Sequence, residues 1–110
     1  MDYRIEEIVN HYEKDVSRVP SISVIAQSLN ISVSRFQHLF KDEMKMSFKQ
    51  FVQGARMRKA CFLLKTTHLR VKEITVMVGC PDETNFIRAF KQTFADTPNN
   101  YRKNHKIRHL

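Results

Sequence analysis

Glycine, proline and cysteine are all scarce in this sequence. Its 110 residues include two glycines, three prolines and no tryptophan, which disfavours a β-sandwich rich in tight turns and favours helices with short connections. The two cysteines, Cys61 and Cys80, form no C-x-x-C pair, as expected for free thiols in a reducing compartment. At this length we expect an all-α chain that forms one compact domain, or two very small ones that share a core.

Signals for a membrane protein, a metal site or an enzyme are also missing. No apolar run approaches the roughly 18 residues that a membrane span needs, and the N-terminus lacks the apolar stretch of a targeting peptide. The histidines are scattered without the spacing of metal ligands. No carboxylate pair, Ser-His-Asp spacing or glycine-rich phosphate loop is evident. We therefore expect no enzyme, no cofactor and no metal.

Positive charge is what the sequence has in excess, and it is unevenly placed. The chain holds 19 Lys and Arg against 11 Asp and Glu, a formal net charge of +8. Residues 1–15 contain five of the acids and two of the bases, so the rest of the chain carries +11. An excess of this size favours a polyanionic partner, most often nucleic acid and less often a membrane surface. A basic protein that is merely soluble is the alternative.

Apolar residues recur at helical spacing along most of the chain. The pattern predicts helices over residues 3–15, 22–29, 32–43, 47–65, 71–78 and 82–94, and a short last helix that begins at Thr97-Pro98. The expected N-caps are Ser21, Ser32, Ser47 and Asp82. Asn30 and Gly79 stand where a left-handed residue can end a helix. Residues 103–110 are expected to form a frayed basic tail.

The segment over residues 47–65 is the longest helical pattern and has a broad apolar face. Its expected inward residues are Phe48, Phe51, Val52, Ala55, Cys61, Phe62, Leu63 and Leu64. Gly54 lies within it, where glycine lowers helix stability by about 1 kcal/mol relative to alanine, so close packing is expected there. Met44, Met46 and Met57 are also expected in the core, because such residues are usually buried.

The two halves of the chain contain the same pattern of residues. Residues 22–30, IxxIAxxLN, match residues 71–79, VxxITxxVG, at an offset of 49. The string FQHLFK at residues 36–41 matches FIRAFK at residues 86–91 at an offset of 50, and the register continues into the next helix. The repeated unit is a short helix, a tight turn and a longer helix. This layout predicts two helix-turn-helix motifs, whose second helices enter the major groove of DNA.

Each of these second helices has an apolar face to anchor it and an outer face of polar or basic groups. Gln37 can pair with the edge of adenine, His38 with a base or a phosphate, and Arg88 with guanine O6 and N7. Ser34 and Thr84 lie near the helix starts, which are the part of a recognition helix that contacts bases. The alternative for each residue is a solvated face without a partner.

The helix over residues 47–65 has a length that suits two recognition helices. Its 19 or so residues span roughly 28 Å at 1.5 Å each, and successive major-groove faces lie about 34 Å apart. A rigid connecting helix of this length could hold both recognition helices in adjacent major grooves on one side of the duplex.

These residues resemble the DNA-binding domain of the AraC/XylS family of bacterial transcription regulators, over about residues 3–103. The resemblance rests on IA at 25–26, NIS at 30–32 and FxxLFK at 36–41, on RxxxAxxLL at 56–64, and on Gly79, Asp82, FxRxFK at 86–91 and FxxTPxxYR at 94–102. It implies seven helices that form two homeodomain-like helix-turn-helix subdomains, over about 22–43 and about 71–95. A long central helix over about 47–65 would join them, with residues 104–110 left as a basic tail.

The resemblance also implies a function and a set of contacts. Ser34, Gln37 and His38 would face bases in one groove. The outer face of the second recognition helix would hold Glu83, Thr84, Ile87 and Arg88. Contacts to phosphates would come from Arg35, Lys41 and Lys91, unless these residues also belong to the base-contacting surfaces. Double-stranded DNA is then the expected partner, and RNA polymerase is a candidate second partner. The expected location is the cytoplasm, at the nucleoid. Any effector or dimerisation domain would lie outside this chain.

Three departures from the family pattern bear on these expectations. Cys80-Pro81 follows the turn glycine where the family commonly has an aromatic residue. Lys45 and Ala95 stand where the family favours glycine, so we expect those turns to differ. Glu83 places a carboxylate near phosphates, which is unfavourable unless it accepts a hydrogen bond from cytosine N4.

Two alternative functions remain open at this point. One is a basic helical module that docks on an acidic protein or a membrane surface, against which the twofold repeat argues. The other is a redox role for Cys80 beside its turn, although a lone thiol without nearby cations is more often inert.

Overall fold

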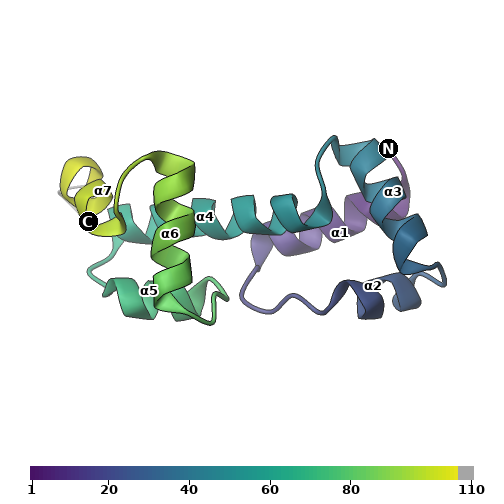
Figure 1. The fold of residues 1–110 in the computed structure, drawn as a ribbon, viewed down its shortest axis with the longest axis horizontal. Coiled ribbons are helices and arrows are strands. Elements are labelled where there is room, and N and C mark those ends of the chain that lie inside the picture. The colour runs from purple at the N-terminus through teal and green to yellow at the C-terminus, as the bar shows by residue number, and fades with distance from the viewer. Residues whose placement is uncertain (107–110) are drawn as a thin grey trace. The chain divides into compact units, whose positions relative to one another are not determined.

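The computed structural model describes residues 1–106, and within them it contains seven α-helices and no β-strand (Figure 1). The helices are α1 (Tyr3–Lys14), α2 (Ile22–Ser28), α3 (Val33–Met44), α4 (Phe48–Thr66), α5 (Val71–Met77), α6 (Glu83–Phe94) and α7 (Pro98–His105). The predicted all-α fold with seven helices is confirmed.

The chain divides into two compact units, Met1–Ala55 and a second one from Arg56 onward. The boundary falls inside α4, so the first turns of this helix belong to the first unit and the remainder to the second. Each unit contains a short helix followed by a longer one, α2 and α3 in the first and α5 and α6 in the second (Figure 1). These pairs are the two helix-turn-helix motifs.

Aromatic rings fill the core of the first unit. Phe36 and Phe40 of α3 are completely buried, and both rings meet the ring of Phe48 of α4 nearly edge-on, at centroid distances of 5.5 and 5.2 Å. The ring of Tyr12 of α1 also meets the Phe48 ring nearly edge-on, at a centroid distance of 6.2 Å. Because Phe36 and Phe40 are four residues apart, they lie on one face of α3. Their burial decides which face of α3 remains in solvent.

The second unit has the same construction with different side chains. Phe86 and Phe90 of α6 are buried, and Phe90 packs edge-on against Tyr101 of α7 at 5.4 Å. Ile74 and Val78, on and just after α5, complete this core. Helix α7 therefore has the role in the second unit that the start of α4 has in the first.

The repeat also includes the helix that precedes each motif, which the sequence comparison did not detect. Four core residues of α1 match four of α4 at an offset of 52: Ile5, Ile8, Val9 and Tyr12 correspond to Met57, Ala60, Cys61 and Leu64. The loop after α1 has seven residues and the loop after α4 has four, so the offset falls to 49 in the following helix. Each unit thus uses four helices, and α4 serves both.

Side-chain caps start the helices where the sequence predicted them. The side chains of Ser21, Ser32 and Asp82 each accept a hydrogen bond from the backbone N–H three residues further on, at 3.3, 3.1 and 3.2 Å. Ser47 and Gln50 form a reciprocal capping box at the start of α4, with bonds of 3.0 and 3.1 Å. Asn30 and Gly79 have the expected positive φ angles, 57° and 85°.

The turns after α3 and α6 match each other, although neither contains glycine. Lys45 has a φ of 59° and Ala95 a φ of 56°. Each N–H donates to the carbonyl four residues earlier, on Lys41 and Lys91, at 2.8 Å. We expected these turns to differ from glycine-containing ones, but the backbone is left-handed, as glycine would favour. For a residue with a Cβ atom, this left-handed conformation is less favourable than the right-handed one by roughly 1–2 kcal/mol.

Three expectations about burial and order are wrong. Phe62 is 59% exposed and Met46 is 39% exposed, whereas Met57 is buried as expected. Phe62 lies on α4, whose residues contribute to two separate cores, and its position belongs to neither. Met46 lies in the turn before α4. Residues 103–105 complete α7 instead of fraying, and the Lys106 ammonium donates to the Thr67 carbonyl. The rest of the predicted tail, residues 107–110, lies outside the described residues.

Candidate nucleic-acid interface

Helix α3 presents a polar outer face because its apolar face is fixed in the core. Ser32 sets the start of the helix through its bond to the Arg35 N–H. With Phe36 and Phe40 buried, the predicted contact residues of α3 all remain exposed: Ser34, Arg35, Gln37, His38 and Lys41. Every residue that the sequence assigned to the first recognition helix is thus exposed on α3.

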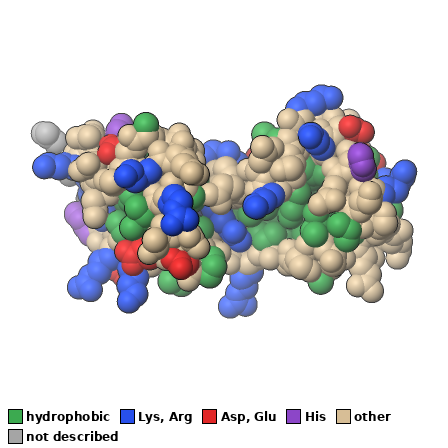
Figure 2. Space-filling model, viewed as in Figure 1, with side chains coloured by type: hydrophobic (Ala, Val, Ile, Leu, Met, Phe, Trp, Pro, Cys, Tyr) green, Lys and Arg blue, Asp and Glu red, His purple; other side chains and the backbone are tan. Residues whose placement is uncertain are grey.

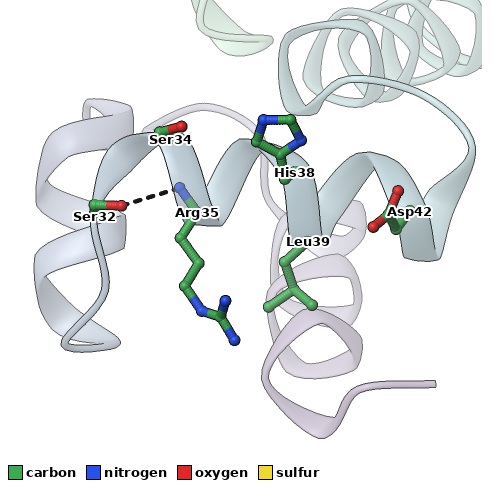
Figure 3. A pocket seen from close by; sticks show the side chains of 6 residues that line it. All are labelled: Ser32, Ser34, Arg35, His38, Leu39 and Asp42. Carbon is green, nitrogen blue, oxygen red and sulfur yellow. Dashed lines mark hydrogen bonds between the residues drawn. The ribbon is translucent and has the colours of Figure 1, made fainter.

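The surface of α3 is hollowed in two places. One shallow depression is lined by Ser32, Ser34, Arg35, His38, Leu39 and Asp42 (Figure 3). A second is lined by Gln37, His38 and Lys41, so His38 borders both. Figure 3 shows the Ser34 and His38 side chains on one side of α3, while the Arg35 side chain extends away from them. A hydroxyl, an imidazole and an amide are therefore available on one side, and a guanidinium on another.

Helix α6 has the same layout with different chemistry. Asp82 caps its start, Phe86 and Phe90 hold it in the core, and four predicted residues are exposed: Glu83, Thr84, Arg88 and Lys91. Ile87, also predicted for this surface, is only partly exposed and packs against the second core. The outer face of α6 is thus polar and charged except at this one position.

Asn85 is a candidate contact residue that the sequence analysis missed. It is exposed, and its side-chain oxygen lies 3.5 Å from Nη1 of Arg88, a long hydrogen bond along one face of α6. Asparagine can bond to adenine N6 and N7. The sequence repeat does indicate this residue. At an offset of 50, Asn85 corresponds to Arg35, which was predicted for the outer surface of the first recognition helix.

Both helices carry exposed cations that an anionic partner could contact, alongside carboxylates of their own. Of the carboxylates in the described part of the chain, none forms an ion pair with Arg35, Lys41 or Lys91, so these cations remain available. Figure 2 shows Lys and Arg side chains on the visible surfaces of both units. It also shows a group of carboxylates near the start of α6, the helix that begins with Asp82 as its cap and Glu83 as its first residue.

Cys80, in the turn between α5 and α6, has the properties of a poorly reactive thiol. Burial raises the pKa of the Cys80 thiol, and the nearby positive charge of Arg56 opposes this shift. The expectation of no cation near Cys80 is therefore wrong, although the raised pKa still keeps the group protonated at neutral pH. Burial likewise raises the pKa of Cys61, which lies in the second core.

Other kinds of site receive no support from residues 1–106. None of the helices there is long and apolar enough to cross a membrane. In the same residues, no group of three or more His, Cys, Asp or Glu side chains is placed to hold a metal ion.

Comparisons with known proteins agree with this geometry. The model of a family described as a helix-turn-helix domain matches residues 25–104. The Msm operon regulatory protein of Streptococcus mutans is 33% identical over 82 residues, which make up 74% of this chain and 30% of that protein. The C-terminal domain of AraT, a response regulator from Geobacillus stearothermophilus, has a TM-score of 0.91 at 28% identity, covering 99% of this chain and 91% of that domain.

A further solved structure, the DNA-binding domain of AdpA in complex with a target DNA, has a TM-score of 0.86 and covers 92% of this chain and 91% of that one. At 19% identity this likeness shows the fold alone. The chain spans roughly a third of the length of the curated relatives that it matches. The family match covers most of the sequence, from within α2 to the end of α6 and beyond, and on this basis the chain belongs to the AraC-type family of helix-turn-helix DNA-binding domains.

Proposed function

We propose that this chain is the DNA-contacting part of a transcription regulator and binds specific sequences of double-stranded DNA through α3 and α6. The observation that carries the proposal is the repeated arrangement of these helices. In each, a pair of phenylalanines four residues apart is buried, and the opposite face holds exposed hydrogen-bonding and cationic groups. Two such helices in one small chain suit the reading of two stretches of major groove.

On α3, the proposed base contacts come from the side that carries Ser34, Gln37 and His38. Gln37 has the two groups that pair with adenine N6 and N7. Ser34 lies in the first turn, where a recognition helix approaches the base edges. Arg35, whose side chain extends away from this side, and Lys41, which lies one turn beyond Gln37 and His38, are assigned to phosphates.

On α6, Arg88 is assigned to a guanine, because its guanidinium matches the O6 and N7 acceptors. Thr84 and Ile87 complete the base-facing side, and Lys91 is assigned to a phosphate, as the counterpart of Lys41. Glu83 is tolerated in this surface if it accepts from cytosine N4. Its carboxylate would otherwise weaken binding.

The two recognition helices are proposed to enter adjacent major grooves. Helix α4 contains 19 residues, a length of about 28 Å at 1.5 Å per residue. Selected binding sites should then contain two specific blocks with centres about 10 base pairs apart. Control of transcription would further require a contact with RNA polymerase at the bound site, and a location at the nucleoid.

A mobility-shift titration with competitor DNA tests the proposal. One probe carries a site selected from a random library, and its matched control is a shuffled probe of the same length and composition. We expect the selected probe to bind at least a thousandfold more tightly at physiological salt. Equal affinity for both probes, or preferential binding to anionic lipid vesicles or an acidic protein, would contradict a sequence-specific regulator.

A further inference from the structure

Ile87 departs from the chemistry of the surface around it. In the repeat register it corresponds to Gln37, which is polar and exposed on α3. Ile87 packs on the second core with part of its surface and leaves the rest in solvent. The first unit builds the same fold with glutamine here, so anchoring the helix does not require an apolar residue. The exposed part of Ile87 is therefore free to contact a partner.

The major groove offers one apolar group that such a side chain can recognise, the C5-methyl of thymine. Ile87 lies three residues after Thr84 and is therefore its neighbour on the surface of α6. Arg88, the next residue along the chain, lies about 100° further round the helix, so Ile87 stands at the edge of the surface assigned to bases. Its β-branched side chain has one strongly preferred χ1 rotamer in a helix, and its contact with the core restrains it further. The side chain thus offers a fixed apolar surface that loses little entropy on binding.

We propose that Ile87 recognises the C5-methyl group of a thymine close to the guanine that Arg88 contacts. The inference rests on the proposed function, since it gives the base preference of the same surface. It also makes the two recognition helices chemically distinct. At the position where α3 offers the amide of Gln37, α6 offers a hydrocarbon surface that favours thymine over the other three bases.

The test replaces thymine by deoxyuridine, one position at a time, in a selected binding site. Deoxyuridine keeps every hydrogen-bonding group of thymine and lacks only the methyl group. For the wild-type chain we expect one position in the α6 block at which this change weakens binding about fourfold, the value of one methyl group removed from water. In Ile87→Ala the same change should have no effect, because the contact is already lost.

Three controls keep the test interpretable. Val76→Ala removes an apolar side chain that is 71% exposed on α5, outside the proposed surface, and it should retain the full deoxyuridine effect. In Ile87→Ala, an unchanged preference at the guanine assigned to Arg88 shows that α6 is still seated correctly. Ile87→Val, which keeps the branched carbons nearest the backbone, should retain part of the effect.

The outcomes separate this inference from the function beneath it. If the chain binds specific DNA but no thymine responds to deoxyuridine, or if Ile87→Ala shows the same fourfold loss as the wild type, Ile87 does not read a methyl group. If the chain has no sequence preference at all, the proposed function itself fails.

Discussion

The two units share one helical frame and one pair of anchoring residues, and they differ in the side chains around them. Phe36 and Phe40 anchor α3 as Phe86 and Phe90 anchor α6, yet the helix that closes each core begins with Phe48 in one unit and Pro98 in the other. The outer faces differ more, since Gln37 and His38 are replaced by Ile87 and Arg88. The comparison shows that a few buried positions set the fold and leave the exposed ones free to specialise.

The largest expected effects come from the shared anchors. Phe40→Ala and Phe90→Ala should each lower the free energy of unfolding by about 3–5 kcal/mol, because both side chains are completely buried. Native-state hydrogen exchange can locate the loss. We expect Phe40→Ala to reduce amide protection mainly in α2 and α3, and Phe90→Ala mainly in α5 and α6.

Met46→Ala is the matched control for these substitutions, since this side chain is partly exposed in a turn and its loss should change stability by about 0.5 kcal/mol or less. If either phenylalanine variant lowered protection equally throughout the described helices, the two units would unfold as one, and the division at Ala55 would have no energetic meaning.

The next effect concerns what distinguishes α6. Arg88→Ala should weaken binding to the selected site by about 1–3 kcal/mol and relax the preference at one base pair. Arg88→Lys keeps the charge but loses the paired N–H groups of guanidinium, so it should recover part of the affinity and little of the preference. Binding to a set of single-base variants measures both quantities. An unchanged site preference in Arg88→Ala would rule out its assignment to a base.

The matching turns predict a smaller effect, in the stabilising direction. Lys45→Gly and Ala95→Gly should each raise the free energy of unfolding by about 1 kcal/mol, because glycine adopts a positive φ without strain, offset in part by its greater freedom in the unfolded chain. Thermal and urea unfolding measure the change. Asn30→Gly is the control and should gain less, since asparagine already tolerates this backbone. Destabilisation by Ala95→Gly would contradict the left-handed assignment.

The smallest change in affinity is expected where the units are alike. Lys41→Ala and Lys91→Ala should weaken binding to all sequences equally and reduce the slope of log affinity against log salt by about 1 each. Titrations at several salt concentrations, on a selected and a shuffled probe, measure this. A loss confined to the selected probe would assign the lysine to a base instead of a phosphate.

Much of this arrangement could be predicted from local sequence signals. The N-caps at Ser32 and Asp82 and the left-handed turn at Gly79 depend on neighbouring residues only, so single positions indicate them. The anchoring faces of α3 and α6 follow from apolar residues at four-residue spacing. For the same reason all the residues predicted for the outer side of α3 are exposed, although Asp42, which is exposed there as well, was not among them.

The errors arose where a residue's surroundings depend on distant parts of the chain. Phe62 has an apolar side chain that would suit a core. However, α4 contributes residues to two cores, so a single helical pattern of apolar residues does not predict which faces of α4 are buried. The backbone at Lys45 and Ala95 is set by the packing of the helices on either side, which outweighs the local preference for glycine. Asn85 differs in type from Arg35, its counterpart in the repeat, so the shared residues of the two units do not indicate it.

The central claim is that a common frame carries two different sets of base contacts, and exchanging one set tests it most directly. Thr84→Ser, Ile87→Gln and Arg88→His together give α6 the three residues that α3 directs at bases, Ser34, Gln37 and His38, and leave Phe86 and Phe90 in place. Selection from a random DNA library, with the wild-type chain beside the triple variant, reports the preferred site of each. We predict that the α6 block of the site changes toward the sequence of the α3 block, while the α3 block and the spacing stay the same. Recovery of the wild-type site by the triple variant would contradict the claim.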